Sequence, residues 1–227
     1  MKKVNKMISV LVSLMLVVTM LFGTSSVWAH EMCMNGSEPV VLKWINKNES
    51  GTFYYTKVNS DNLGSDSMYH DNYQAAVNMW TNSPTKALSQ VTDFTISNVD
   101  LYTDSAYNWY TTERLSKDTL AYTILYDTNY NMIYKTNEQA INSTKEIIYA
   151  KIMFNPNHKN NSMYDGLDEA LQTSAIAHEI GHVYTLGHSN TIYEVLPSSI
   201  PSIMKASVHE ASTYIAQHDI DDMNIKY

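Results

Sequence analysis

Cysteine and arginine are almost missing from this chain of 227 residues. Cys33 is the single cysteine, so no disulfide can form within the chain, and Arg114 is the single arginine. Acidic residues outnumber basic ones by 23 to 15, which gives a formal net charge of −8. A protein that binds nucleic acid usually carries a basic surplus. The charge balance therefore argues against nucleic acid as a partner.

Charged residues of either sign are also scarce, at 17% of the chain, whereas apolar residues make up 44%. This composition is not that of a disordered chain. The sequence shows no internal repeat and no linker rich in proline and glycine. Its length suits one domain with a real core. We expect a single domain over residues 30–227.

The first 29 residues have the pattern of a secretory signal peptide. Lys2, Lys3 and Lys6 precede a mostly apolar run at 8–22, and the segment ends in Val27-Trp28-Ala29. We expect cleavage after Ala29. An uncleaved anchor is less favoured, because a run of about 15 residues is short for a span of about 20. The protein is thus expected to be secreted and extracellular, without stable membrane association, and its lysine-rich usage hints at a Gram-positive bacterium.

Local patterns predict strands interleaved with two long helices. Periodic apolar residues predict one helix from Asp71 to the break at Ser83-Pro84, and another from Leu167 with Asp165 as its cap. Residues typical of strands predict β-structure at 52–58, 94–101 and 147–154, and a hairpin with strands at 120–126 and 132–134. Polar segments predict loops at 59–67 and 155–166. We expect an α+β fold in which helices pack on a mixed sheet.

The second helix contains His178 and His182, with Glu179 between them. Histidines four apart share one face of a helix, so both imidazoles can reach one metal ion. Zinc lowers the pKa of its bound water to about 7 and polarises a carbonyl group. Glu179 can take a proton from this water and pass it to a leaving amine. The motif therefore predicts zinc-dependent hydrolysis of an amide.

A catalytic zinc takes three protein ligands and keeps one position open. His188 follows His182 by six residues. The rivals Glu194 and Glu210 follow His182 by 12 and 28 residues, and neither matches the spacing of about 20 in thermolysin-like enzymes. We predict His178, His182 and His188 as the ligands of one catalytic zinc.

The stretch from His178 to His188 (HEIGHVYTLGH) resembles the zinc motif of the metzincin metalloproteases, and Ser189 after it resembles that of the matrixins among them. Met204, in the segment PSIM, resembles the methionine of the metzincin Met-turn. Residues 217–227 are similar to the last helix of a matrixin catalytic domain. The resemblance spans most of residues 40–227 and is strongest from 165 to 227.

This resemblance implies a twisted mixed β-sheet with an active-site helix, a second long helix and a C-terminal helix. It implies a secreted, monomeric zinc endopeptidase that acts on proteins or peptides, with Glu179 as the catalytic residue that activates a zinc-bound water. Met204 would support the zinc ligands from beneath without taking part in the chemistry. Residues 149–154 would be the sheet edge that a peptide joins as an extra strand, and residues 195–204 would line the specificity pocket. Calcium would be a further cofactor, with no ligands that can be named.

The chain departs from the family pattern beside both motifs. Thr185 stands where the family usually has glycine, and a β-branched residue tolerates a positive φ poorly. Either Gly187 takes the bend or Thr185 adopts another conformation. Lys205 follows Met204 where matrixins usually have an aromatic residue. Ala206 stands where other subfamilies have a tyrosine, so we expect no tyrosine ligand.

Two other functions stay open. One is a secreted metal-binding or adhesion module that kept the zinc site without turnover, although the intact Glu179 argues against it. The other is a metal hydrolase that acts on a non-protein amide. Cys33 could in principle reach the zinc as an inhibitory thiolate, but it lacks the arginine-glycine context of the matrixin switch. We expect surface positions, rather than a second zinc site, for the remaining candidates His158, His209 and His218.

One acidic segment matches part of a calcium-loop pattern. Its oxygen donors would be Asp127, Asn129, Asn131 and Glu138. Met132 stands at the sixth position, where that loop needs glycine. A hairpin turn is therefore the favoured interpretation.

Overall fold

The computed structural model describes residues 33–35, 38–40, 43–44, 53–56, 68–81, 88–91, 99–103, 105–106, 108–113, 115–116, 119–135, 146–156, 168–189, 200–207 and 210–226. The predicted signal peptide at 1–29 lies outside the described residues. So do the predicted loop at 59–67 and most of the one at 155–166. No helix in the described ranges is long and apolar enough to cross a membrane.

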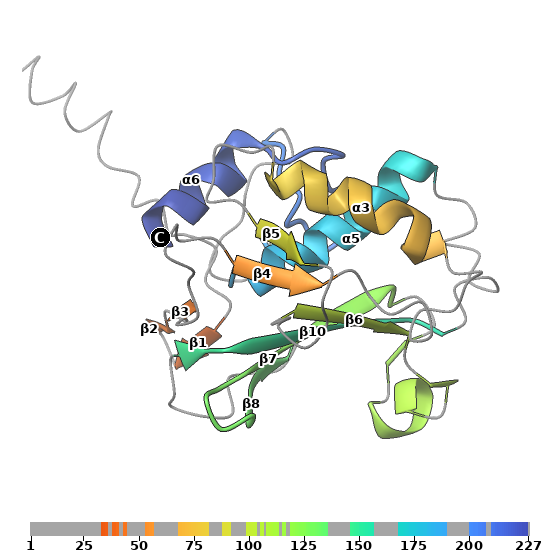
Figure 1. The fold of residues 1–227 in the computed structure, drawn as a ribbon. Coiled ribbons are helices and arrows are strands. Elements are labelled where there is room, and N and C mark those ends of the chain that lie inside the picture. The colour runs from red at the N-terminus through yellow and green to blue at the C-terminus, as the bar shows by residue number, and fades with distance from the viewer. Residues whose placement is uncertain are drawn as a thin grey trace, which may run out of the picture.

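A four-stranded mixed sheet has the strand order β6-β10-β7-β8. β6 (Val99–Thr103) runs parallel to β10 (Tyr149–Phe154), and β10 runs antiparallel to β7 (Ala121–Tyr126). β7 and β8 (Met132–Lys135) form an antiparallel pair, which confirms the predicted hairpin. In Figure 1 the long helices lie on one side of this sheet.

Three short strand pairs complete the described β-structure. β1 (Cys33–Asn35) is antiparallel to β2 (Glu38–Val40), and β3 (Lys43–Trp44) is parallel to β9 (Glu146–Ile147). β4 (Phe53–Thr56) is parallel to β5 (Leu88–Val91). β4 confirms the strand predicted at 52–58.

Three α-helices and one short π-helical segment are described. α3 (Met68–Thr81) begins three residues before the predicted start and ends just before Ser83-Pro84. The others are α5 (Glu169–Val183), α6 (Gln217–Lys226) and the π-helical η2 (Asn108–Thr112). Together with the mixed sheet they make an α+β fold, as predicted.

The predicted cap of α5 is wrong. Asp168, not Asp165, has the extended backbone of an N-cap, and its Oδ1 accepts a hydrogen bond from the Leu171 amide at 2.9 Å. A capping side chain bonds the amide two or three residues further on. Asp165 lies too far before the first helical residue, Glu169, to do this.

The predicted edge strand is also wrong. β10 lies between β6 and β7. Ile152 is paired with Leu101 on one side and with Thr123 on the other. Because both sides of β10 are already hydrogen-bonded, a peptide cannot join it as an extra strand. The predicted strand at 147–154 is also split, since β9 ends at Ile147 and β10 begins at Tyr149.

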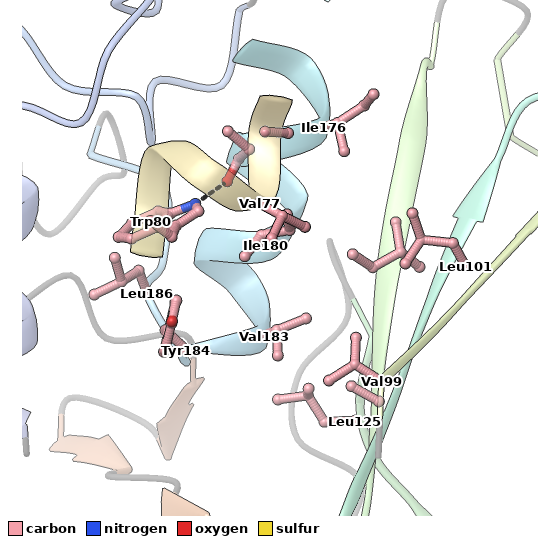
Figure 2. Close-up of a cluster of buried hydrophobic side chains, with 14 of the residues drawn as sticks. Val77, Trp80, Val99, Leu101, Leu125, Ile176, Ile180, Val183, Tyr184 and Leu186 are labelled. Carbon is pink, nitrogen blue, oxygen red and sulfur yellow. Dashed lines mark hydrogen bonds between the residues drawn. The ribbon is translucent and has the colours of Figure 1, made fainter. Parts of the chain in front are cut away.

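The main core lies between the sheet and the two long helices. Figure 2 shows apolar side chains of α3 and α5 facing those of the sheet: Val77, Ile176, Ile180 and Val183 against Val99, Leu101 and Leu125. Burying one such side chain stabilises a fold by about 1.5–3 kcal/mol. This contact fixes α5, which carries the histidine motif, against the sheet.

Two tryptophans hold α5 by its backbone. Trp80 of α3 donates from Nε1 to the Ala177 carbonyl oxygen at 2.8 Å (Figure 2). Trp44 of β3 donates from Nε1 to the Val183 carbonyl oxygen at 2.6 Å. Val183 is the last residue of α5, where carbonyls lack a partner within the helix. α5 is thus fixed both along its length and at its end.

Candidate metal centre

The structure brings the three predicted histidine ligands together. His178 and His182 lie one turn apart on α5, and His188 follows the end of that helix. The Nε2 atom of His188 is 3.2 Å from Nε2 of His178 and 3.2 Å from Nε2 of His182. The possible ligand atoms of all three lie within 4.8 Å of one another. The three side chains are therefore close enough to bind one metal ion.

The bend that returns His188 to the helix is made at Thr185. Its φ of 67° lies in the left-handed region, a conformation that costs a β-branched residue about 1–3 kcal/mol. The Thr185 amide donates to the His182 carbonyl at 2.9 Å, and the Leu186 amide donates to that of Gly181 at 3.1 Å. Thr185 is fully buried, and these contacts hold it in the strained conformation. The expectation that Thr185 would avoid a positive φ is therefore wrong, because Thr185 itself adopts that conformation.

Backbone carbonyls fix the orientation of two imidazoles. His178 Nδ1 is 2.8 Å from the Ile203 carbonyl oxygen, and His182 Nδ1 is 2.7 Å from that of Leu186. A carbonyl only accepts, so each Nδ1 carries the hydrogen and donates it. In the neutral ring Nε2 then has a lone pair, and in both residues Nε2 faces His188. This arrangement is typical of histidines that bind a metal through Nε2.

The separations of these nitrogens fit a small divalent cation. Two nitrogens at the usual zinc distance in a tetrahedral site lie about 3.3 Å apart, close to the observed 3.2 Å. At most one of the two contacts can be a hydrogen bond, because His178 and His182 offer only lone pairs there. A cation between the three rings satisfies all the lone pairs at once. The donor set and its spacing therefore fit a metal ion.

Burial keeps these imidazoles in the form that binds metals. Burial and, to a smaller extent, the nearby His188 lower the pKa of His178 to about 3, although the bond to the Ile203 carbonyl opposes the shift. Burial, His178 and His188 likewise hold the pKa of His182 well below its ordinary value. Both rings are neutral near pH 7, so a metal ion would not have to displace a proton from Nε2.

Glu179 is a buried carboxyl group on the same helix, with only 6% of its surface exposed. Thr123 of β7 donates from Oγ1 to Glu179 Oε2 at 2.7 Å. Burial raises the pKa of Glu179 to about 7, and the Thr123 hydrogen bond partly opposes this shift. A carboxyl group with such a pKa can both accept and release a proton near neutral pH. No sequence pattern indicates this role for Thr123, which is 56 residues from Glu179.

Met204 lies directly against the histidine helix. It is fully buried, and a Cβ added at Gly181 would collide with Met204 Sδ. Gly181 lies between Glu179 and His182 on α5, so the methionine packs beneath the turn that carries the candidate ligands.

Asp219 of α6 ties the segment around Met204 to the C-terminal helix. It is fully buried. Its Oδ1 accepts from the Ser202 hydroxyl at 2.6 Å, and its Oδ2 accepts from the amides of Ile203 at 3.0 Å and Ala216 at 2.9 Å. Ile203 in turn supplies the carbonyl that orients His178. Sequence reasoning noted Asp219 only within the matrixin-like C-terminus and missed this role.

The calcium-loop segment forms a hairpin turn. Asp127 Oδ1 accepts from the amides of Asn129 at 2.8 Å and Asn131 at 2.9 Å. Tyr130 completes the turn with a φ of 58°. The carboxylate of Asp127 is thus used by the turn itself. Glu138 lies outside the described residues.

The other candidates do not join the cluster in the described part of the chain. His218 lies on α6, with Nε2 3.7 Å from Asp222 Oδ2. Lys205 is buried and Ala206 is exposed. The remaining candidates lie outside the described residues: His158, His209, Glu194 and the pocket-wall residues 195–199. Cys33 is the first residue of β1.

No protein-family model matches the chain, and a search of curated proteins finds no match.

Proposed function

We propose that the protein is a secreted zinc endopeptidase of the metzincin type, similar to the matrixins. The observation that carries the proposal is the convergence of three imidazole Nε2 atoms, two of them from the helix that also carries the buried carboxyl group of Glu179. Three histidines with an open fourth position are a donor set of catalytic zinc sites. The order of the motif residues and the Met204 contact support the metzincin type.

His178, His182 and His188 would hold the zinc ion, which when bound supplies an activated water and polarises the scissile carbonyl. Glu179 takes the proton from the attacking water and delivers it to the leaving amine. The carbonyls of Ile203 and Leu186 keep two of the imidazoles in the tautomer that this requires. Met204 and Asp219 support this arrangement and do not touch the reacting atoms.

The alternative is a secreted metal-binding or adhesion module without turnover. A static metal site does not need a buried carboxyl group on the helix that carries its ligands, and burying one is costly. The position of Glu179 therefore favours the enzyme. A hydrolase that acts on a non-protein amide would use the same site and differs only in its substrate.

The decisive experiment compares metal content with cleavage. We expect the mature chain, residues 30–227, to bind one zinc ion and to cleave members of a peptide library. A chelator should stop cleavage, and added zinc should restore it. Bound zinc without cleavage of any peptide would contradict the endopeptidase and leave the alternatives.

Replacing the proposed base tests the mechanism directly. We expect Glu179→Gln to retain zinc and to lose about 10²–10⁴-fold in kcat, the usual contribution of general acid–base catalysis. Glu169→Gln is the matched control, because Glu169 is exposed in the first turn of the same helix. Full activity of Glu179→Gln would refute the mechanism.

A further inference from the structure

The structure assigns a second residue to the proposed reaction: Thr123 of β7 positions the carboxylate of Glu179 for proton transfer. This inference rests on the proposed function. Thr123 itself does not touch the reacting atoms and acts through Glu179.

The position of Thr123 in the sheet makes its hydroxyl group unusual. Along β7, Tyr122 and Ile124 belong to a small cluster with Trp109, whereas Leu125 belongs to the main core. Side chains alternate between the faces of a strand, so Thr123 lies on the same face as Leu125, toward the helices. It is fully buried there. A hydroxyl group buried among apolar side chains is costly unless it is hydrogen-bonded.

Glu179 supplies the partners for this hydroxyl group. The Thr123 Oγ1 atom is 2.7 Å from Glu179 Oε2 and 3.2 Å from the Glu179 carbonyl oxygen. A hydroxyl group has one hydrogen to donate, and the shorter, charge-assisted bond is the stronger. The hydrogen bond from Thr123 thus fixes the position of Oε2, and Oε1 is then the oxygen that can accept a proton.

Rigid neighbours set the position of Thr123. It is paired with Ile152 of β10, which is itself fully buried in the core. Since Glu179 comes from α5 and Thr123 from β7, the hydrogen bond also sets the distance between the helix and the strand at the site. Small displacements of a catalytic group cost up to about 10²-fold in rate.

Thr123→Val tests this role, because valine keeps the shape of threonine but cannot donate. We expect kcat to fall about 10–100-fold while KM changes little, since Thr123 does not bind substrate. Zinc content should be unchanged, because the Thr123 hydroxyl group bonds Glu179, which is not a candidate ligand. Thr123→Ser restores the donor and should recover most of the lost kcat.

Thr173→Val is the matched control. Thr173 is also a buried threonine, but it lies on α5 rather than on β7. Its hydroxyl group is 3.4 Å from Asn72 Oδ1 of α3. We expect this variant to keep the wild-type kcat. Equal losses of kcat in Thr123→Val and Thr173→Val would show a general structural effect and overturn the positioning role.

A double-mutant cycle gives a readout that does not depend on activity. Unfolding of the metal-free protein would be compared for the wild type, Thr123→Val, Glu179→Ala and the double variant. We expect the two changes to be clearly non-additive, because each removes one partner of the same bond. Additive effects on stability would overturn this inference alone. So would an unchanged kcat in Thr123→Val when the wild type is active. A wild type that cleaves no peptide would instead overturn the proposed function, while the cycle would still test the bond.

Discussion

At the scale of single residues, Gly181 shows how little room the histidine helix has. Its absent side chain makes space for Met204 Sδ, and Trp80 closes the same side. Alanine favours a helix by about 1 kcal/mol over glycine, yet overpacking a filled core costs about 1–3 kcal/mol. We expect Gly181→Ala to lose stability in denaturant unfolding and to bind zinc more weakly, because Met204 must move.

Removing the Met204 side chain tests whether its contact with residue 181 causes this loss of stability. Met204→Ala should itself destabilise the protein by leaving a cavity. Combined with Gly181→Ala, however, it should cost less than the sum of the two single changes. If the two costs simply add, the steric contact between residues 181 and 204 does not explain the choice of glycine.

The residues that bear the proposed chemistry could be predicted because their spacing is local. His178, Glu179 and His182 follow from the geometry of one helix turn, whatever surrounds that helix. Thr123 could not be predicted, because its contact with Glu179 depends on how a distant strand packs. The conformation of Thr185 could not be predicted either. A β-branched residue disfavours a positive φ, and the surrounding contacts impose one.

At the scale of elements, Asp219 couples α6 to the segment that orients His178. Asp219→Asn replaces one carboxylate oxygen by an NH2 group, which donates. In either orientation of the amide, this NH2 group would face the Ser202 hydroxyl or the Ile203 amide, and each of these is itself a donor that needs an oxygen. We expect a loss of about 2–3 kcal/mol in stability, as for a broken hydrogen bond to a buried charged group. Zinc affinity should fall about tenfold, at the lower end for residues that support metal ligands.

Asp221→Asn provides the control on the same helix. Asp221 is exposed and bonds Gln217 Nε2 at 2.8 Å within α6. Zinc titration and unfolding of both variants separate the coupling from a general effect on the helix. A zinc affinity that stays at the wild-type value in Asp219→Asn would show that α6 does not support the metal centre.

The positions of the strands along the chain were predicted better than the pairing between the strands. The run of strand-forming residues at 147–154 correctly predicts β-structure, although the structure divides it into β9 and β10. This run contains no information about the two edges of β10, which are paired with β6 and β7 from distant parts of the sequence. The edge was therefore misplaced, whereas the β7–β8 hairpin was found because its two strands are joined by one short turn.

At the scale of the whole molecule, the candidate centre joins α5 to the chain that follows it. His188 comes from beyond the end of α5, and the next residue, Ser189, donates from its amide to the Met204 carbonyl at 3.0 Å. A metal ion held by His178, His182 and His188 would therefore fasten the helix to the chain that turns beneath it. Binding only to the folded state should stabilise that state.

We expect calorimetry to show a lower Tm after chelation and its return when zinc is added. At zinc concentrations about 1,000 times Kd, the gain in stability is about 4 kcal/mol. His188→Ala should lose most of this gain, because two imidazoles remain, whereas His218→Ala on α6 should keep it. If His188→Ala gains as much from zinc as the wild type does, the third ligand lies elsewhere, and the bend at Thr185 serves another purpose.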